Sequence, residues 1–129
     1  MNKTADKFSW NKRAKSFSYA GRGIALLIRN EHNAWIHLSV FALVILAGLF
    51  FQITSTEWIY ITIVAAMVLL SEAFNTAIEY LCNHVSPNQN ETIGKVKDIA
   101  AGAVLIAAIA AAIVGSLIFV PYLIDILKH

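Results

Sequence analysis

Two glutamates, Glu72 and Glu79, lie inside an apolar stretch that is long enough to cross a membrane. A charged side chain near the centre of a membrane helix costs about 2.5–3.5 kcal/mol on insertion scales. Two such residues in one span, with Asn75 between them, need a reason, and at bilayer depth that reason is more often a functional site than an accident. The chain must therefore fold so that these carboxyl groups are hidden from lipid.

The composition agrees with a membrane location. The chain has 129 residues, of which 58% are hydrophobic and only 14% are charged. This balance is typical of a small, single-domain integral membrane protein rather than a soluble domain. Its one cysteine, Cys82, excludes an internal disulfide, and the four histidines are too scattered along the sequence to predict a zinc site.

Three apolar segments predict three membrane-spanning helices, because the backbone in lipid must satisfy its own hydrogen bonds. Gln52–Glu57 is expected to be a tight polar turn. His84–Lys97 is expected to be a longer polar loop, with Pro87 and Gly94 as helix breakers. The expected spans are Asn33–Phe51, Trp58–Asn83 and Asp98–Ile126.

The positive charges predict the orientation. Seven of the ten Lys and Arg residues fall in the first 29 positions, and Lys95 and Lys97 lie in the second connection. The positive-inside rule then places the N-terminus and that connection in the cytoplasm, and the C-terminus outside. Phe8–Asn30 is expected to be an amphipathic helix on the inner membrane surface. A simple topology anchor is the alternative interpretation of the same segment.

The polar residues of the second span share one face. At about 100° per residue, Glu72 and Glu79 are about 20° apart, Asn75 lies within about 60° of the same line, and Asn83 returns to it. The resulting stripe leads toward Lys97 and Asp98 at the start of the third span.

This set of side chains suits phosphate chemistry. Carboxylates and an amide oxygen suit Mg²⁺, a lysine can bind phosphate, and a partly desolvated carboxylate can accept a proton from an alcohol. The usual P-loop motif is absent. Purely structural roles are the alternatives: Glu79 could form an ion pair with Lys97 or Arg22, and Asn75 could form hydrogen bonds between helices. From these residues alone, a membrane enzyme and a small proton-coupled transporter both remain open.

Two motifs resemble the prokaryotic diacylglycerol kinase family, which includes undecaprenol kinases. They are the run EAFNTAIE from Glu72 to Glu79 and the run KDIAAGAVLI that begins at Lys97. The resemblance covers about Lys12 to Pro121. It implies homotrimers with three membrane helices and a surface helix in each protomer. It also implies active sites between protomers at the cytoplasmic interface, which transfer the γ-phosphate of MgATP to a lipid alcohol.

The resemblance also implies roles for individual residues. Glu72 matches the catalytic base, and Glu31 and Glu79 match acidic ligands of the metal, Mg²⁺. Six further positions match the substrate or nucleotide site: Tyr19, Gly23, Asn75, Asn83, Lys97 and Asp98. Asn83 departs from the family, which usually has aspartate there, so a charge that could assist nucleotide or metal is lost.

The sequence therefore predicts an all-α homotrimeric lipid kinase of the bacterial inner membrane. Its partners would be ATP, Mg²⁺ and a lipid alcohol, either diacylglycerol or undecaprenol, with no nucleic acid. The alternative is a membrane scaffold or proton-coupled transport subunit that uses the glutamate stripe for helix pairing or proton relay.

Overall fold

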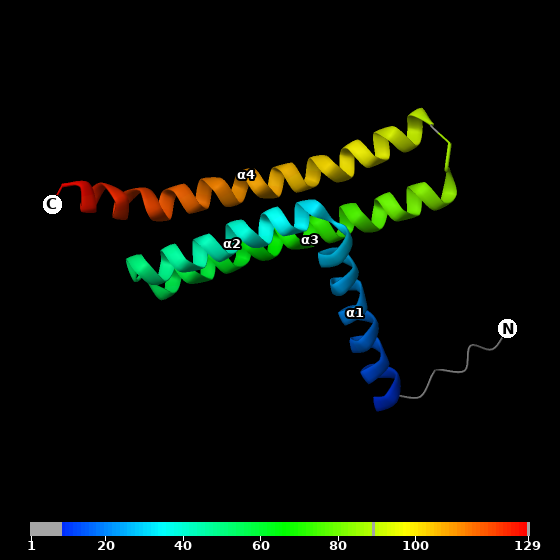
Figure 1. The fold of residues 1–129 in the computed structure, drawn as a ribbon, viewed down its shortest axis with the longest axis horizontal. Helices are drawn as coiled ribbons and strands as arrows, with labels where there is room; N and C mark the ends of the chain where they lie inside the picture. Colours follow the sequence, from blue (N-terminus) through cyan, green and yellow to red (C-terminus); the bar gives the residue numbers. More distant parts are fainter. Residues whose placement is uncertain (1–8, 89, 129) are drawn as a thin grey trace.

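The computed structural model describes residues 9–88 and 90–128, and every regular element in this part of the chain is a helix. Three of the helices are long and apolar enough to cross a membrane. The predicted fold class, an all-α protein with three candidate spans, is thus confirmed for these residues. In chain order (Figure 1), the helices are α1 (Trp10–Asn30), α2 (His32–Phe51), α3 (Ser55–Val85) and α4 (Glu91–Leu127).

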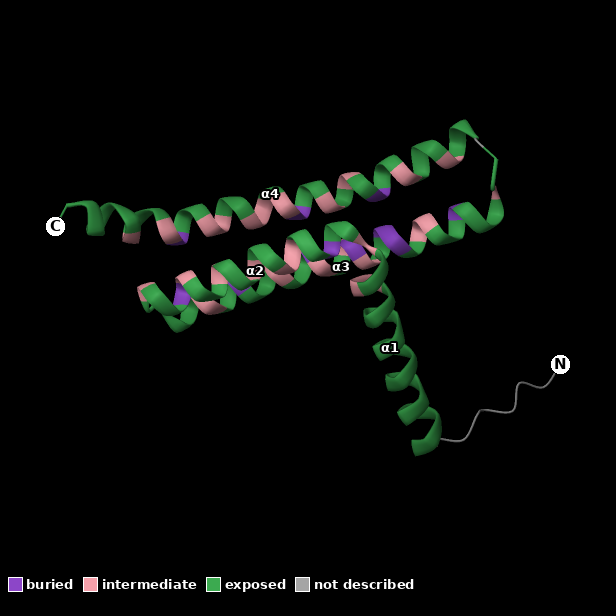
Figure 2. Ribbon diagram, viewed as in Figure 1, coloured by how far each residue is buried: buried purple, intermediate pink, exposed green. Residues whose placement is uncertain are grey.

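The three apolar helices run side by side, each antiparallel to the next, and α1 projects from their side (Figure 1). The bundle has two ends. We call the end with the α2–α3 connection, residues 52–54, the turn end, and the end with the α3–α4 connection, residues 86–90, the loop end. Buried residues lie where helices meet, whereas the outward faces are exposed (Figure 2). Because the exposed faces carry many large apolar side chains, they are suited to contact lipid.

The turn end closes tightly. Gln52 adopts the left-handed conformation, with φ 51°, and ends α2. Thr54 then begins α3 with a capping box, in which its side chain accepts from the Glu57 N–H while its own N–H donates to the Glu57 carboxylate at 2.7 Å. These bonds satisfy backbone groups that would otherwise be left unpaired at the helix ends.

Apolar packing holds all three helices together at this end. Gly48 of α2 lies against the Trp58 ring so closely that an added Cβ would be 2.6 Å from it. α4 joins the same cluster, and its Tyr122 hydroxyl donates to a Glu57 carboxylate oxygen at 2.9 Å. The buried centre of this cluster is formed by Ile53, Ile61 and Ile118.

The loop end corrects one prediction. The expected loop, His84–Lys97, was too long, because α3 continues to Val85 and α4 already begins at Glu91. The Asn90 side chain caps α4 by accepting from the N–H groups of Thr92 and Ile93. This cap and the long helix that follows it outweigh the helix penalty of Gly94, which therefore lies within the helix.

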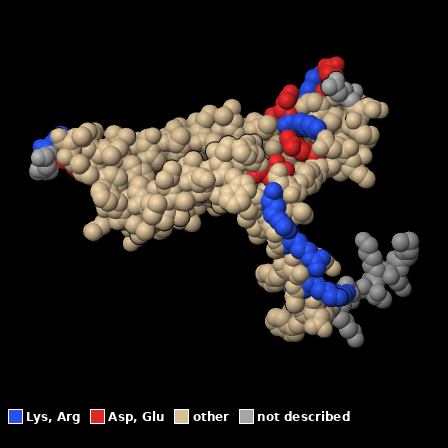
Figure 3. All heavy atoms as spheres, viewed as in Figure 1, with Lys and Arg blue, Asp and Glu red and all other residues tan. Residues whose placement is uncertain are grey.

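The chain breaks between α1 and α2 at a single residue. Glu31 is extended, with φ −103° and ψ 113°, and its N–H still donates to the Leu27 carbonyl. This elbow turns the chain sharply, so that α1 leads away from the bundle (Figure 1). α1 contains no buried residue, and Lys and Arg side chains follow its length in Figure 3. Its position on a membrane surface stays a prediction.

Candidate active site

Glu72 is the most enclosed polar residue of the site. It lies beyond the middle of α3, and only 1% of its surface is exposed. Its Oε2 atom has no hydrogen-bond partner within the described part of the chain. Leaving a buried polar atom unpaired costs about 1–3 kcal/mol, and more for a charged group. An enclosed carboxyl oxygen of this kind is suited to receive a proton or a donor from a bound molecule.

Two further unpaired atoms lie on the next turn of α3. The Oδ1 atom of Asn75 and the Oγ1 atom of Thr76 are buried, and neither has a partner among the described residues. Asn75 was predicted as a site residue, and it shares the enclosed region with Glu72. Thr76 was not among the predicted site residues, although its place on the same face could have revealed it.

Glu72 is surrounded by polar side chains from the elbow, from α2 and from α3. Glu31 and Glu79 are near enough to repel its carboxylate, whereas His37 attracts it and the Asn33 amide lies beside it. The extended backbone at Glu31 explains how a residue outside the spans reaches this place. The structure thus gathers three predicted acids, two of them assigned to metal and one to catalysis.

Lys97 and Asn83 form a second polar group at the loop end. The Lys97 ammonium donates to the Asn83 side-chain oxygen at 2.6 Å, which joins α4 to the last turns of α3. Lys97 is therefore engaged by Asn83, and its neighbour Asp98 is exposed. Both Asn83 and Lys97 line a polar pocket of about 560 Å³. Its other lining residues are Ser86, Pro87, Asn88, Asn90, Glu91, Ile93 and Gly94.

Tyr19 and Gly23 lie apart from this group. Both are exposed on α1, where the Arg22 guanidinium stacks over the Tyr19 ring at 5.7 Å. Since α1 leads away from the bundle, one protomer does not bring these two residues to the pocket that holds Lys97 (Figure 1). Their predicted contact with nucleotide would need a different protomer or a different placement of α1.

The acidic residues suit a magnesium ion only in part. Within residues 9–88 and 90–128, no group of three or more His, Cys, Asp or Glu side chains is close enough to hold a metal. Mg²⁺, however, commonly uses one or two carboxylates and takes its other ligands from phosphates and water. Glu31 and Glu79, which both lie near Glu72, fit that pattern. The metal role of Glu31 and Glu79 stays a prediction.

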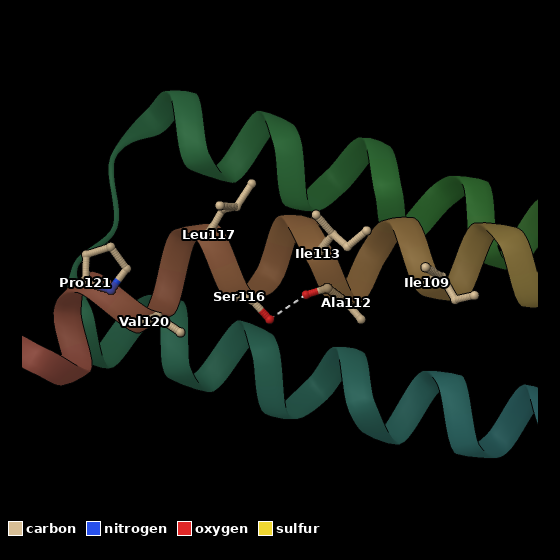
Figure 4. A pocket seen from close by; sticks show the side chains of 7 residues that line it. All are labelled: Ile109, Ala112, Ile113, Ser116, Leu117, Val120 and Pro121. Carbon is tan, nitrogen blue, oxygen red and sulfur yellow. Dashed lines mark hydrogen bonds between the residues drawn. The ribbon is translucent and has the colours of Figure 1, made fainter.

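Two other hollows of the bundle are largely apolar. Figure 4 shows one of about 570 Å³ on α4, where Ser116 provides the only side-chain hydroxyl and donates it to the Ala112 carbonyl at 2.8 Å. A longer groove of about 630 Å³, which we call the α2–α4 groove, runs between α2 and α4 with α3 as its floor. It is apolar except for Ser116 and His37, and His37 lies near Glu72.

These features define a class: a helical membrane protein that encloses an acidic side chain within its bundle and carries a lysine pocket at one end. The family model described as prokaryotic diacylglycerol kinase matches residues 18–119. The chain therefore belongs to the prokaryotic diacylglycerol kinase family, and it is a multi-pass membrane lipid kinase. The predicted family is confirmed.

Two relatives agree with this assignment. The chain is 34% identical to an undecaprenol kinase of Bacillus subtilis over 113 residues, which cover 88% of this chain and 92% of the relative. It is 32% identical to a diacylglycerol kinase of Synechocystis over 113 residues, covering 87% of this chain and 65% of the relative. The chain is thus similar both to a protein named as an undecaprenol kinase and to one named as a diacylglycerol kinase.

Proposed function

We propose that this protein transfers the γ-phosphate of MgATP to the hydroxyl group of a membrane lipid alcohol. The observation that carries the proposal is the enclosed Glu72, whose unpaired Oε2 atom is positioned to accept a proton. Family membership supports the lipid kinase class, and the lysine pocket at the loop end offers a place for phosphates.

The proposed reaction is a direct in-line transfer. Glu72 takes the proton of the lipid hydroxyl, the alcohol oxygen forms a bond to the γ-phosphorus, and the bond to ADP breaks. Lys97 compensates phosphate charge, Asp98 positions the nucleotide, and Asn75 orients the reacting alcohol. Glu31 and Glu79 would hold Mg²⁺, which supplies charge neutralisation for the phosphates.

The preferred alcohol in this proposal is undecaprenol. The support is that the undecaprenol kinase of Bacillus subtilis matches over 92% of its length, whereas the diacylglycerol kinase of Synechocystis matches over 65%. Diacylglycerol remains the competing substrate, because both lipids present a primary alcohol at the end of an apolar body. The scaffold or transport alternative is not retained, since the chain belongs to a kinase family.

A homotrimer in a bacterial inner membrane completes the proposal. Tyr19 and Gly23 belong to α1, which leads away from the bundle (Figure 1), so a neighbouring copy would have to supply them to a shared nucleotide site. The Lys and Arg distribution supports a cytoplasmic N-terminus and loop end, and an outer C-terminus.

The deciding experiment is an ADP-release assay in mixed micelles with MgATP. Undecaprenol, diacylglycerol and a lipid without a hydroxyl group would be compared at equal mole fraction. We expect ADP release to depend on an alcohol, to be faster with undecaprenol, and to yield the phosphorylated lipid. Equal ADP release with and without any alcohol would contradict the kinase proposal, and a faster reaction with diacylglycerol would reverse the lipid preference.

A further inference from the structure

His37 lines the α2–α4 groove and is also a neighbour of the enclosed acid, Glu72. It is an ionisable residue within an otherwise apolar lining. Its ring packs parallel to Phe41, one helical turn away, with 6.5 Å between centroids and 25° between planes. Both rings line the α2–α4 groove.

The helical faces explain why His37 meets Glu72. Ala34, one turn before His37 on α2, is 1% exposed, so this face of α2 packs against the bundle. Val68, one turn before Glu72 on α3, is also 1% exposed and lines the same groove as His37. Residues one turn apart share a helix face, so His37 and Glu72 lie at neighbouring levels of the α2–α3 contact.

The polar surroundings of Glu72 make this neighbour important. Glu31 and Glu79 repel a negative charge on Glu72, whereas His37 and the Asn33 side chain favour it. The Glu72 Oε2 atom still has no partner in the described chain. An imidazole always carries at least one N–H group, which can donate to a carboxylate.

We propose that His37 is a positioning residue for Glu72: its imidazole N–H donates to the Glu72 carboxylate and directs the free oxygen toward an alcohol that enters along the α2–α4 groove. This inference rests on the proposed function. His37 does not itself take the proton of the alcohol. It holds the acceptor in one orientation against the repulsion of two neighbouring acids, and it therefore acts mainly on the rate of transfer.

The kinetic test compares His37→Leu, which lacks a donor, with His37→Gln, whose amide can donate. Since a misplaced catalytic group can cost on the order of a hundredfold in rate, we expect His37→Leu to lower kcat by about tenfold to a hundredfold. The KM values for ATP and lipid should change little, because the lost interaction acts on the transition state. His37→Gln should recover most of the lost kcat.

The matched control is Ser39→Leu, an exposed position on the same helix whose hydroxyl bonds only to its own helix at Trp35. This variant should behave as the wild type. Wild-type kcat in folded His37→Leu would overturn the inference. So would a loss that His37→Gln does not repair, or a loss confined to the lipid KM, which would make His37 part of the binding groove only.

A second measurement separates this inference from the proposed function. Thermal unfolding in micelles would be followed for His37→Leu, Glu72→Gln and the double variant. If the two side chains interact, the midpoint shift of the double variant will differ from the sum of the single shifts. Additive shifts would overturn the inference even in an active enzyme. If the wild type lacks lipid-stimulated turnover, the proposed function fails, and the coupling alone decides whether His37 holds Glu72.

Discussion

The two ends of the bundle use polar side chains in opposite ways. At the turn end, Thr54, Glu57 and Tyr122 bond to one another and close the connection between the helices. Around Glu72 and on the next turn toward the loop end, buried polar atoms have no partner in the described chain. The first arrangement stabilises the fold, whereas the second leaves hydrogen-bonding capacity for bound molecules. The polar residues that stabilise the fold are therefore separated along the bundle from those available for chemistry.

The largest expected effect comes from the unpaired acid. Glu72→Gln keeps the volume but removes the proton acceptor, so turnover should fall by about 10²–10⁴-fold. The variant should retain its helical content and its elution volume in detergent. The measurement is lipid-stimulated ADP release from purified protein. Near-normal turnover would remove the base assignment from Glu72.

The next effect concerns the lysine at the loop end. Lys97→Ala removes a charge that we assign to phosphate binding, and a hydrogen bond to a charged group is worth about 1.5–3 kcal/mol. The KM for ATP should therefore rise by about tenfold to a hundredfold. Lys95→Ala is the matched control, because Lys95 pairs with the exposed Glu91 on its own helix. An equal rise in both variants would indicate a general loss of positive charge instead.

A change at the turn end should affect stability rather than chemistry. Gly48→Ala places a methyl group 2.6 Å from the Trp58 ring, and overpacking of this kind costs about 1–3 kcal/mol. The unfolding midpoint should fall, while kcat measured well below that midpoint stays unchanged. Gly102→Ala, which meets open space on α4, should not lower the midpoint. A reduced kcat in folded Gly48→Ala would show that the two ends are coupled.

The smallest effect is the loss of one hydrogen bond. Tyr122→Phe removes the donor to Glu57, which should lower the unfolding midpoint slightly. The exposed Tyr60 provides the control variant, Tyr60→Phe. Both variants should have the turnover of the wild type. If thermal unfolding does not distinguish them, the bond contributes nothing measurable to the turn end.

Sequence reasoning found the parts of the site that lie on one helix. The helical period alone aligned Glu72 with Asn75, and the structure encloses both. The spans were also found, because long apolar runs in lipid have few alternatives. The start of α4 was missed because the Asn90 cap acts against Gly94, and the balance between a cap and a breaker is not visible in composition.

Contacts between helices were harder to predict. His37 and Asn33 meet Glu72 only because Ala34 sets how α2 lies on α3 and because the chain turns at Glu31. Both depend on packing and on one extended residue, which the periodicity of a single segment does not reveal. For the same reason, the resemblance assigned Tyr19 and Gly23 to the nucleotide site but did not predict how far they lie from Lys97 within one protomer.

The length of α4 has a consequence for how two unlike substrates can meet. Its 37 residues extend over about 55 Å, whereas the hydrocarbon layer is only about 30 Å thick. Even a tilted helix of this length must project beyond that layer. A water-soluble nucleotide could then bind to the projecting part while the apolar tail of the lipid alcohol stays within the bilayer. The nucleotide would stay in water and the lipid tail in the bilayer. The protein would need only to bring the two reacting groups together at the boundary between these phases.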